Sequence, residues 1–211
     1  MTDDYRNTKY CPLFKDLKEK KDAVVELVLA DHPGEEDIHK FVSINDGPYK
    51  LPFMKVYNCK CGYCGASSHF IPKRLFEIDH FVYEKSPKFK DKAAAGHIEN
   101  LVLACQACNR AKSALIIPDE MQTQLSPDSE TLPSTFVRDD QYYIRISSDQ
   151  KGSPFVEQFY KKLKLDSEIH RLDYLLMNMI GLQEKNAANS KLYHQLGQAI
   201  DILRLKRNIM G

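Results

Sequence analysis

The sequence predicts an α+β fold in which a small ββα unit, stapled by four cysteines, is flanked by N-terminal and C-terminal α-helices. Three observations lead to this prediction. Two Cys-x2-Cys pairs, separated by 40 residues, form a pattern that implies a metal site. Two short apolar runs between the first and last cysteine have the composition of strands. Outside this unit, apolar residues recur at helical spacing.

The composition suits a globular protein with a real hydrophobic core. The 211 residues are 43% hydrophobic and 28% charged, which is the usual range for soluble domains. An apolar run long enough to cross a bilayer is missing, and the first residues lack the basic-then-apolar order of a signal peptide. We therefore expect a cytoplasmic protein without membrane association. In a reducing compartment, close cysteine pairs hold metal more often than disulfides.

We expect three parts along the chain: a helical lead-in over residues 1–55, the unit that carries the chemistry over 56–117, and a linker, β-hairpin and helical region over 118–211. In the lead-in, apolar spacing predicts a helix over residues 10–30, and Pro12 suits its first turn. The sequence His-Pro-Gly at 32–34 ends that helix. A second short helix is expected over 35–44.

The central part shows the strand and helix signals of the ββα unit. Apolar residues in alternation predict a first strand around residues 76–81, and residues 101–103 predict a second. The polar, lysine-rich stretch over 84–99 is expected to be a loop. Residues 106–116 are expected to form the helix, which ends before a proline.

The last part begins with a stretch that reads as a linker. Residues 118–135 hold three prolines among Ser, Thr, Asp and Glu, a composition typical of a loose loop. A hairpin is expected around Asp139 and Asp140. The helical patterns that follow cover these ranges: 153–164, 166–182 and 189–208.

The four paired cysteines are the strongest metal-site candidates: Cys61, Cys64, Cys105 and Cys108. Two residues between cysteines let both thiolates reach one ion from a tight turn, and two such turns complete a closed tetrahedral zinc site. A closed site leaves no open position, so this zinc is expected to be structural and coupled to folding. The alternatives are unrelated buried cysteine pairs or a redox pair. Cys59 lies near enough to compete, with a tighter spacing to Cys61.

Between the cysteine pairs, an acidic residue stands beside a histidine. Asp79 and His80 at the end of a short strand offer a hard metal ligand next to a general base, and a phosphodiester hydrolase needs both. Asn100 precedes the second strand, Asn109 follows the last cysteine, and Lys112 lies one helical turn further. Taken singly, these residues could be surface pairs, turn residues or a helix cap.

Taken in order, these residues resemble an HNH endonuclease of the ββα-metal (His-Me finger) superfamily. The pattern is Cys-x2-Cys, Glu-x-Asp-His, a loop, then Asn-Leu-Val-Leu-x-Cys-x2-Cys-Asn-x2-Lys, over about residues 57–115. The C-terminal helices are similar, loosely, to those of bacterial restriction and phage-defence nucleases. The resemblance implies metal-dependent hydrolysis of DNA, in defence against phage or foreign DNA. A protein partner such as an operon-encoded ATPase is a further expectation.

The resemblance also implies a role for each residue. His80 matches the general base, Asp79 the acidic metal ligand, and Asn100 the residue that fixes the loop and so orients the base. Asn109 stands where the last histidine of the pattern usually stands. An asparagine oxygen suits a hard cation, which favours Mg²⁺ or Mn²⁺ as the catalytic ion. Lys112 is expected to meet a phosphate.

Basic residues around this unit are the remaining candidates for substrate binding. Residues 55–116 carry ten Lys and Arg against five Asp and Glu, where a polyanion would bind. Lys88, Lys90 and Arg110 are expected to contact backbone phosphates. A solvated loop is an equal alternative for the two lysines.

Two other functions stay open. A non-catalytic zinc-ribbon module for nucleic acid or protein would keep the cysteines without needing Asp79, His80 or Asn109. A nuclease subunit that depends on a partner chain would use the helical flanks as docking surfaces. The presence of all three residues favours the enzyme.

Overall fold

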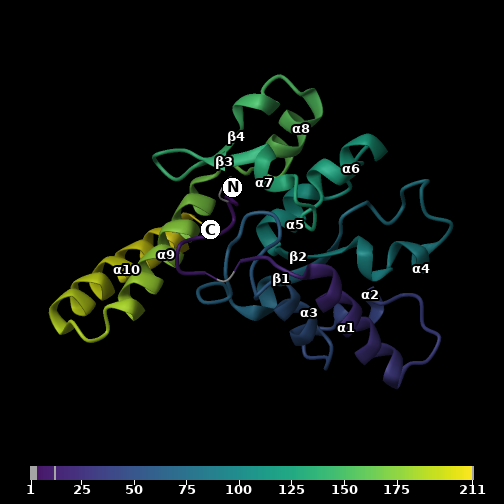
Figure 1. Ribbon diagram of the computed structural model, residues 1–211, viewed down its shortest axis with the longest axis horizontal. Coiled ribbons are helices and arrows are strands. Elements are labelled where there is room, and N and C mark those ends of the chain that lie inside the picture. Colours follow the sequence, from purple (N-terminus) through teal and green to yellow (C-terminus); the bar gives the residue numbers. More distant parts are fainter. Residues whose placement is uncertain (1–3, 12, 211) are drawn as a thin grey trace.

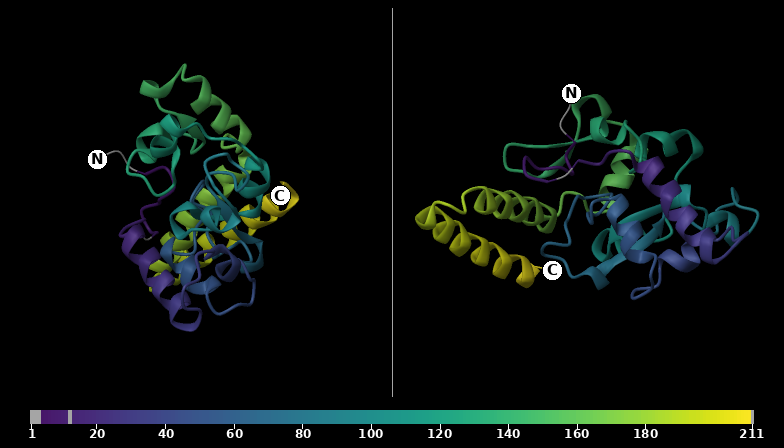
Figure 2. Two further views of the ribbon diagram at one scale, coloured as in Figure 1. Left: turned by 90° about the vertical axis from the view of Figure 1, so that its right-hand side faces the viewer. Right: turned by 60° about the horizontal axis from the view of Figure 1, so that its bottom comes forward.

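The computed structural model describes residues 4–11 and 13–210, and Figure 1 shows their arrangement. The fold is α+β, as predicted, with helices around two antiparallel two-stranded sheets. An arm made of α9 (Glu168–Lys185) and α10 (Ser190–Met210) projects from the body of the molecule (Figures 1 and 2). Pro12, which we expected in a first helical turn, lies outside the described residues.

In its described residues, the N-terminal part forms three helices: α1 (Leu17–Asp31), α2 (His39–Val42) and α3 (Lys50–Val56). The helix expected over 10–30 begins later, because Asp16 has a left-handed backbone with φ of 52°, which an α-helix does not admit. The helix expected over 35–44 is reduced to α2. The sequence pattern does not reveal α3, whose Pro52 lies in the first turn, where proline has no helical hydrogen bond to lose.

The central unit has these elements: η1 (Lys73–Leu75), β1 (Phe76–His80), α4 (Lys92–Ala95), η2 (Ile98–Asn100), β2 (Leu101–Cys105) and α5 (Gln106–Lys112). The strands pair antiparallel, with Ile78 opposite Leu103, and α5 packs on both, which confirms the ββα order. The stretch over 84–99, expected to be a loop, contains α4. The last helix ends before 116 because the φ of Ser113 is 50°.

Side chains from the N-terminal helices contact the carbonyl groups at the free edge of β1. Nζ of Lys50, on α3, donates a hydrogen bond to the carbonyl oxygen of Phe76 at 2.7 Å. Nε2 of His39, on α2, lies 3.2 Å from the carbonyl oxygen of Ile78. Because a two-stranded sheet leaves one edge of each strand unpaired, buried carbonyl groups there need donors from elsewhere. Residues outside the central unit supply them to β1.

Residues 118–135 are not the loose linker that their composition predicts. They form two short helices: α6 (Asp119–Leu125) and α7 (Leu132–Thr135). Pro118 and Pro133 stand at the starts of these helices, which proline tolerates because the first N–H groups have no helical partner. Leu125 and Leu132 are fully buried, so the segment belongs to the core.

The C-terminal part agrees with the sequence pattern. Its remaining elements are β3 (Phe136–Arg138), β4 (Ile144–Ile146), η3 (Ser148–Gln150) and α8 (Pro154–Lys162). β3 and β4 form the predicted hairpin, and α8, α9 and α10 are the three predicted helices.

One hydrophobic core joins all three parts of the chain. Its buried members run from Tyr5 near the start to Leu165 after α8. The lead-in therefore packs as core against the central unit. Within the described ranges, no helix has the length and apolarity needed to cross a membrane.

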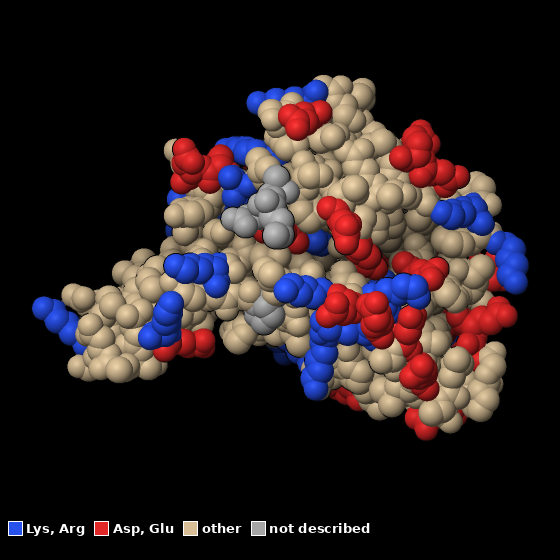
Figure 3. Space-filling model, in the orientation of Figure 1, with Lys and Arg blue, Asp and Glu red and all other residues tan. Residues whose placement is uncertain are grey.

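Acidic side chains gather on one face of the molecule. In Figure 3, Asp and Glu residues cluster at the lower right, over α1 and α2. This matches the eleven acidic against eight basic residues in 1–54. Lys and Arg side chains lie among them in the same view, so the excess of negative charge on this face is modest.

Candidate active site and metal centre

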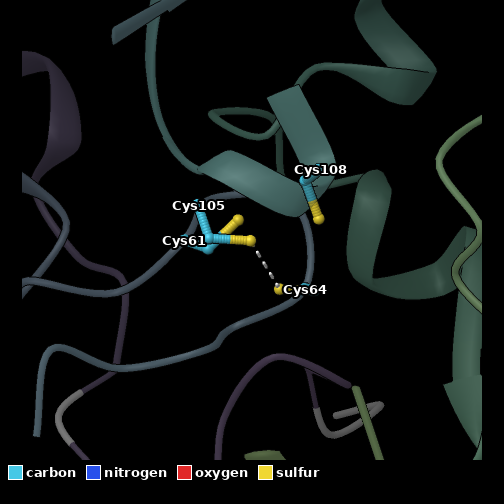
Figure 4. Close-up of side chains that lie close together, drawn as sticks. All are labelled: Cys61, Cys64, Cys105 and Cys108. Atoms are coloured by element: carbon cyan, nitrogen blue, oxygen red, sulfur yellow. Dashed lines mark hydrogen bonds between the residues drawn. The ribbon is translucent and has the colours of Figure 1, made fainter. Parts of the chain in front are cut away.

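The four paired cysteines come together in one buried cluster (Figure 4). Their sulfur atoms all lie within 4.8 Å of one another, and the described cysteines form no disulfide. Sγ of Cys64 lies 3.8 Å from Sγ of Cys105. Four Zn–S bonds of about 2.3 Å in a tetrahedron place the sulfur atoms about 3.8 Å apart. The cluster therefore fits a closed, four-thiolate zinc site, and it leaves Cys59 and Cys11 outside.

Local backbone geometry builds the first cysteine turn. The amide of Gly62 donates to the carbonyl oxygen of Leu103 at 2.7 Å, which ties the turn to β2. Gly65 has φ of 80°, and a side chain there would meet the backbone of Arg6, so only glycine fits. Burial opposes a lower pKa for the Cys61 thiol, but hydrogen bonds from the neighbouring thiols outweigh it and lower that pKa, while the pKa values of Cys64 and Cys108 are raised. A low thiol pKa favours the thiolate that binds metal.

His80 closes β1 and is half-buried. Its Nε2 atom is buried and has no hydrogen-bond partner within the described part of the chain. The ring of His39 lies against it, with 4.2 Å between ring centroids. Burial, together with His39 and the ammonium groups of Lys112 and Lys92, lowers the pKa of His80 to about 4. His80 is therefore neutral at pH 7, the state in which an imidazole can accept a proton.

Asp79 is buried between the first cysteine turn and α5. The hydroxyl of Tyr63, which stands inside that turn, donates to Oδ2 of Asp79 at 2.5 Å. Nζ of Lys112 lies 3.0 Å from the same oxygen. Burial raises the pKa of Asp79, and the charge of Lys112 works in the opposite direction. Both neighbours bind the carboxylate, so its charge is compensated inside the protein.

Lys112 does not lie on the surface, where a phosphate contact was expected. Its side chain is 1% exposed. Besides Asp79, its ammonium group donates to the carbonyl oxygen of His80 at 2.7 Å. Because a buried ammonium needs such partners, a phosphate contact by Lys112 would require this ion pair to rearrange.

Asn100 fastens the chain directly after His80. Its Oδ1 accepts from the amide of Val82 at 2.8 Å, and its Nδ2 donates to the carbonyl oxygens of Val82 and Ala95 at 3.0 and 2.9 Å. Its own carbonyl accepts from the amide of Phe81 at 2.8 Å. One side chain thus holds the segment between β1 and α4.

Asn109 lies on the face of α5 that meets β1, but its amide contacts Glu77. Nδ2 of Asn109 donates to Glu77 at 2.6 Å, and Gln106 donates to the other carboxylate oxygen at 3.2 Å. No contact joins Asn109 to Asp79 among the described residues. Carboxylate and amide oxygens suit a hard cation such as Mg²⁺ or Mn²⁺, but the four-cysteine cluster is the metal-holding group found among the described residues.

The remaining basic candidates lie on the surface of the same unit. Lys88, Lys90 and Arg110 are exposed. Lys88 bonds Gln122 of α6 and lines a cavity of about 320 Å³ beside Asn100. These side chains can reach a ligand in solution without disturbing the core.

Sequence reasoning missed two residues of this site. Tyr63 stands between Cys61 and Cys64, so its place in the cysteine turn was the available signal. His39 lies outside the central unit, and no local pattern marks it.

Comparison with known protein families agrees with this geometry. Residues 61–115 match the family model described as HNH endonuclease. No curated protein and no solved structure matches the chain. The match begins at the first cysteine of the cluster and ends just beyond α5, so the family pattern and the ββα unit coincide. The chain therefore carries an HNH endonuclease domain at residues 61–115, built around a four-cysteine cluster that fits zinc.

Proposed function

We propose that the protein is a metal-dependent endonuclease that hydrolyses DNA phosphodiester bonds, with His80 as the general base. The observation that carries this proposal is the place of the half-buried His80 at the end of β1, inside an HNH domain, with the chain after it fastened by Asn100. A neutral imidazole can take a proton from the attacking water. Asn100 positions His80 by holding the backbone that follows it.

Asp79 and Asn109 are the residues that would hold the catalytic cation, with Glu77 beside them. Bound Mg²⁺ or Mn²⁺ would offset the charge that builds on the phosphate oxygens. In this proposal the zinc at the four cysteines is structural, because four thiolates leave it no position for substrate.

The exposed basic residues support DNA as the substrate. Lys88, Lys90 and Arg110 are the proposed backbone contacts, since phosphate binding needs accessible cations. The acidic face over α1 and α2 would point away from the duplex. We further propose a cytoplasmic role in bacterial defence, with a partner such as an operon-encoded ATPase. This rests on the loose resemblance of the helical tail to that of defence nucleases.

One observation favours a second function, a non-catalytic zinc-ribbon module that binds nucleic acid or protein. Both oxygens of the Asp79 carboxylate are engaged, by Tyr63 and Lys112. If that arrangement persists with divalent metal present, Asp79 is a structural residue. A nuclease subunit that cuts DNA only together with a partner chain would also show no cleavage when it is purified alone.

Plasmid cleavage by the purified protein tests the proposal. We expect nicking or cutting with Mg²⁺ or Mn²⁺, none with EDTA, and none by His80→Ala. His97→Ala is the matched control, because His97 is an exposed histidine of the same domain, and it should cleave as wild type does. Equal cleavage by His80→Ala would remove the role given to His80. Absence of cleavage by the wild type under every condition would favour the second function.

A further inference from the structure

We propose that His39, which lies outside the HNH match, is a positioning residue that holds the imidazole of His80 in its working orientation. The inference rests on the proposed function, because it concerns the base of that reaction. It adds a residue from the N-terminal helices to a site whose other members come from residues 61–115.

Two contacts fix the His39 ring next to the base. Its centroid lies 4.2 Å from that of His80, with 38° between the ring planes. Its Nε2 lies 3.2 Å from the carbonyl oxygen of Ile78, two residues before His80. A carbonyl oxygen only accepts, so Nε2 of His39 is the donor in this contact. The hydrogen bond sets where His39 lies on β1, and the ring contact then limits the rotation of His80.

The helix that carries His39 is itself anchored on both sides. Ile38 is buried in the core. The backbone amide of His39 donates to the carbonyl oxygen of Gly96 at 3.1 Å. A side chain at Gly96 would collide with Asp37, so the two segments touch there. The start of α2 is thus held between β1 and the end of α4, so the backbone that carries the His39 ring has a fixed position.

The imidazole of His80 depends on a packed neighbour for its orientation. Its Nε2 atom is buried without a hydrogen-bond partner in the described residues. A histidine base is usually oriented by a hydrogen bond to its second nitrogen. Here that bond is missing, so packing has to set the ring angle. His39 is the aromatic ring in contact with it.

Three substitutions separate the two contacts of His39. His39→Ala removes both, His39→Phe keeps the ring, and His39→Gln keeps a side-chain donor without the ring. In steady-state cleavage of a DNA duplex, we expect His39→Ala to lower kcat about 10- to 100-fold, the usual effect of losing a supporting partner, with KM close to wild type. His39→Phe should recover most of the rate, and His39→Gln little of it.

His32→Ala is the matched control. The His32 ring stacks on Phe41, with 4.3 Å between centroids, so it is a histidine in the same part of the fold that does not contact His80. It should leave kcat unchanged. Melting temperature and zinc content measured on each variant identify any that fail to fold, and His39→Phe and His39→Gln then carry the comparison.

A second readout does not depend on cleavage. In NMR spectra of histidine-labelled protein, the His80 ring signals should shift in His39→Ala and stay near their wild-type positions in His32→Ala. Unchanged His80 signals would overturn the inference, as would wild-type kcat in a folded His39→Ala. If instead His80→Ala cleaves as wild type does, the proposed function fails, whatever His39 does.

Discussion

The cysteine cluster and the His80 site occupy the same ββα unit, yet they are built in different ways. The cluster takes two ligands from the turn at Cys61 and Cys64 and two from the junction of β2 and α5, at Cys105 and Cys108. The His80 site draws on distant parts of the chain, including His39 on α2 and the carbonyl edge of β1 that Lys50 covers. A closed metal site is specified by local spacing, whereas an open catalytic site depends on how remote elements pack.

The two regions are nevertheless linked through one side chain. Tyr63 belongs to the first cysteine turn, and its hydroxyl holds Asp79 next to the proposed base. Loss of zinc should therefore disturb the His80 site, while substitution of His80 should leave the zinc bound.

The largest effect is expected from Cys105→Ser. Removing one of four thiolates opens the cluster, and structural zinc in small sites contributes roughly 10 kcal/mol or more to folding. We expect the variant to lose its metal and the cooperative melting of the domain, measured by metal analysis and circular dichroism. Cys59→Ser, a neighbouring cysteine outside the cluster, is the control and should keep both. A folded, metal-free Cys105→Ser would contradict the role of the cluster.

Lys112→Met should have the next largest effect. It leaves the buried carboxylate of Asp79 without its cationic partner, which typically costs about 3–5 kcal/mol. Urea unfolding measures this loss, and zinc should remain bound until the protein unfolds. Lys88→Met, at a lysine that is 48% exposed, should change stability little. Equal stability of the two variants would show that the ion pair between Lys112 and Asp79 does not stabilise the fold.

Tyr63→Phe should weaken the connection between the cysteine cluster and the His80 site. It removes the hydroxyl that donates to Asp79, and losing a hydrogen bond to a buried charged group costs about 1–3 kcal/mol. Zinc content should be unchanged, because no cysteine is altered, while the cleavage rate should fall. A variant with the wild-type cleavage rate would mean that the two regions are not coupled through Tyr63.

The last expected effect is a pH dependence in the helical arm, whose upper limit over the whole pH window is similar to the cost of Tyr63→Phe. Burial raises the pKa of Asp173 on α9 to about 6, and Arg207 on α10 partly offsets this. Between about pH 4 and 6 the unfolded chain has released this proton and the folded chain has not. Stability should therefore fall as pH rises through that window, by at most about 1.4 kcal/mol per pH unit.

Asp173→Asn removes the titrating group, so the same part of the stability profile should become flatter. Urea unfolding at a series of pH values checks this. A profile that keeps its slope in the variant would assign the dependence to another group.

Much of the central unit can be predicted from sequence, because its signals are local. The spacing of the cysteines predicts the cluster, and the alternation around Ile78 predicts β1. The helices within 118–135 were missed because prolines that read as loop residues occupy helix starts. His39 was missed because its contacts join segments that lie far apart in sequence, and local spacing carries no information about such contacts.

Lys112 shows a different limit. Its position one turn after Asn109 predicts that it lies near the site, and it does. Whether its ammonium group faces solvent or a buried carboxylate depends on the depth of Asp79 beneath α5. Periodicity gives the face of a helix, but not how deeply a facing residue is buried.

In the proposed function, zinc at the four cysteines stabilises the ββα unit, and His80 activates the water that cleaves the phosphodiester bond. The most direct test measures zinc per chain and the single-turnover cleavage rate on one preparation of His80→Ala. We predict one zinc per chain, a melting temperature like that of wild type, and a rate lower by roughly 10²- to 10⁴-fold, the usual contribution of a general base. Cleavage at the wild-type rate, or loss of zinc together with activity, would contradict the account.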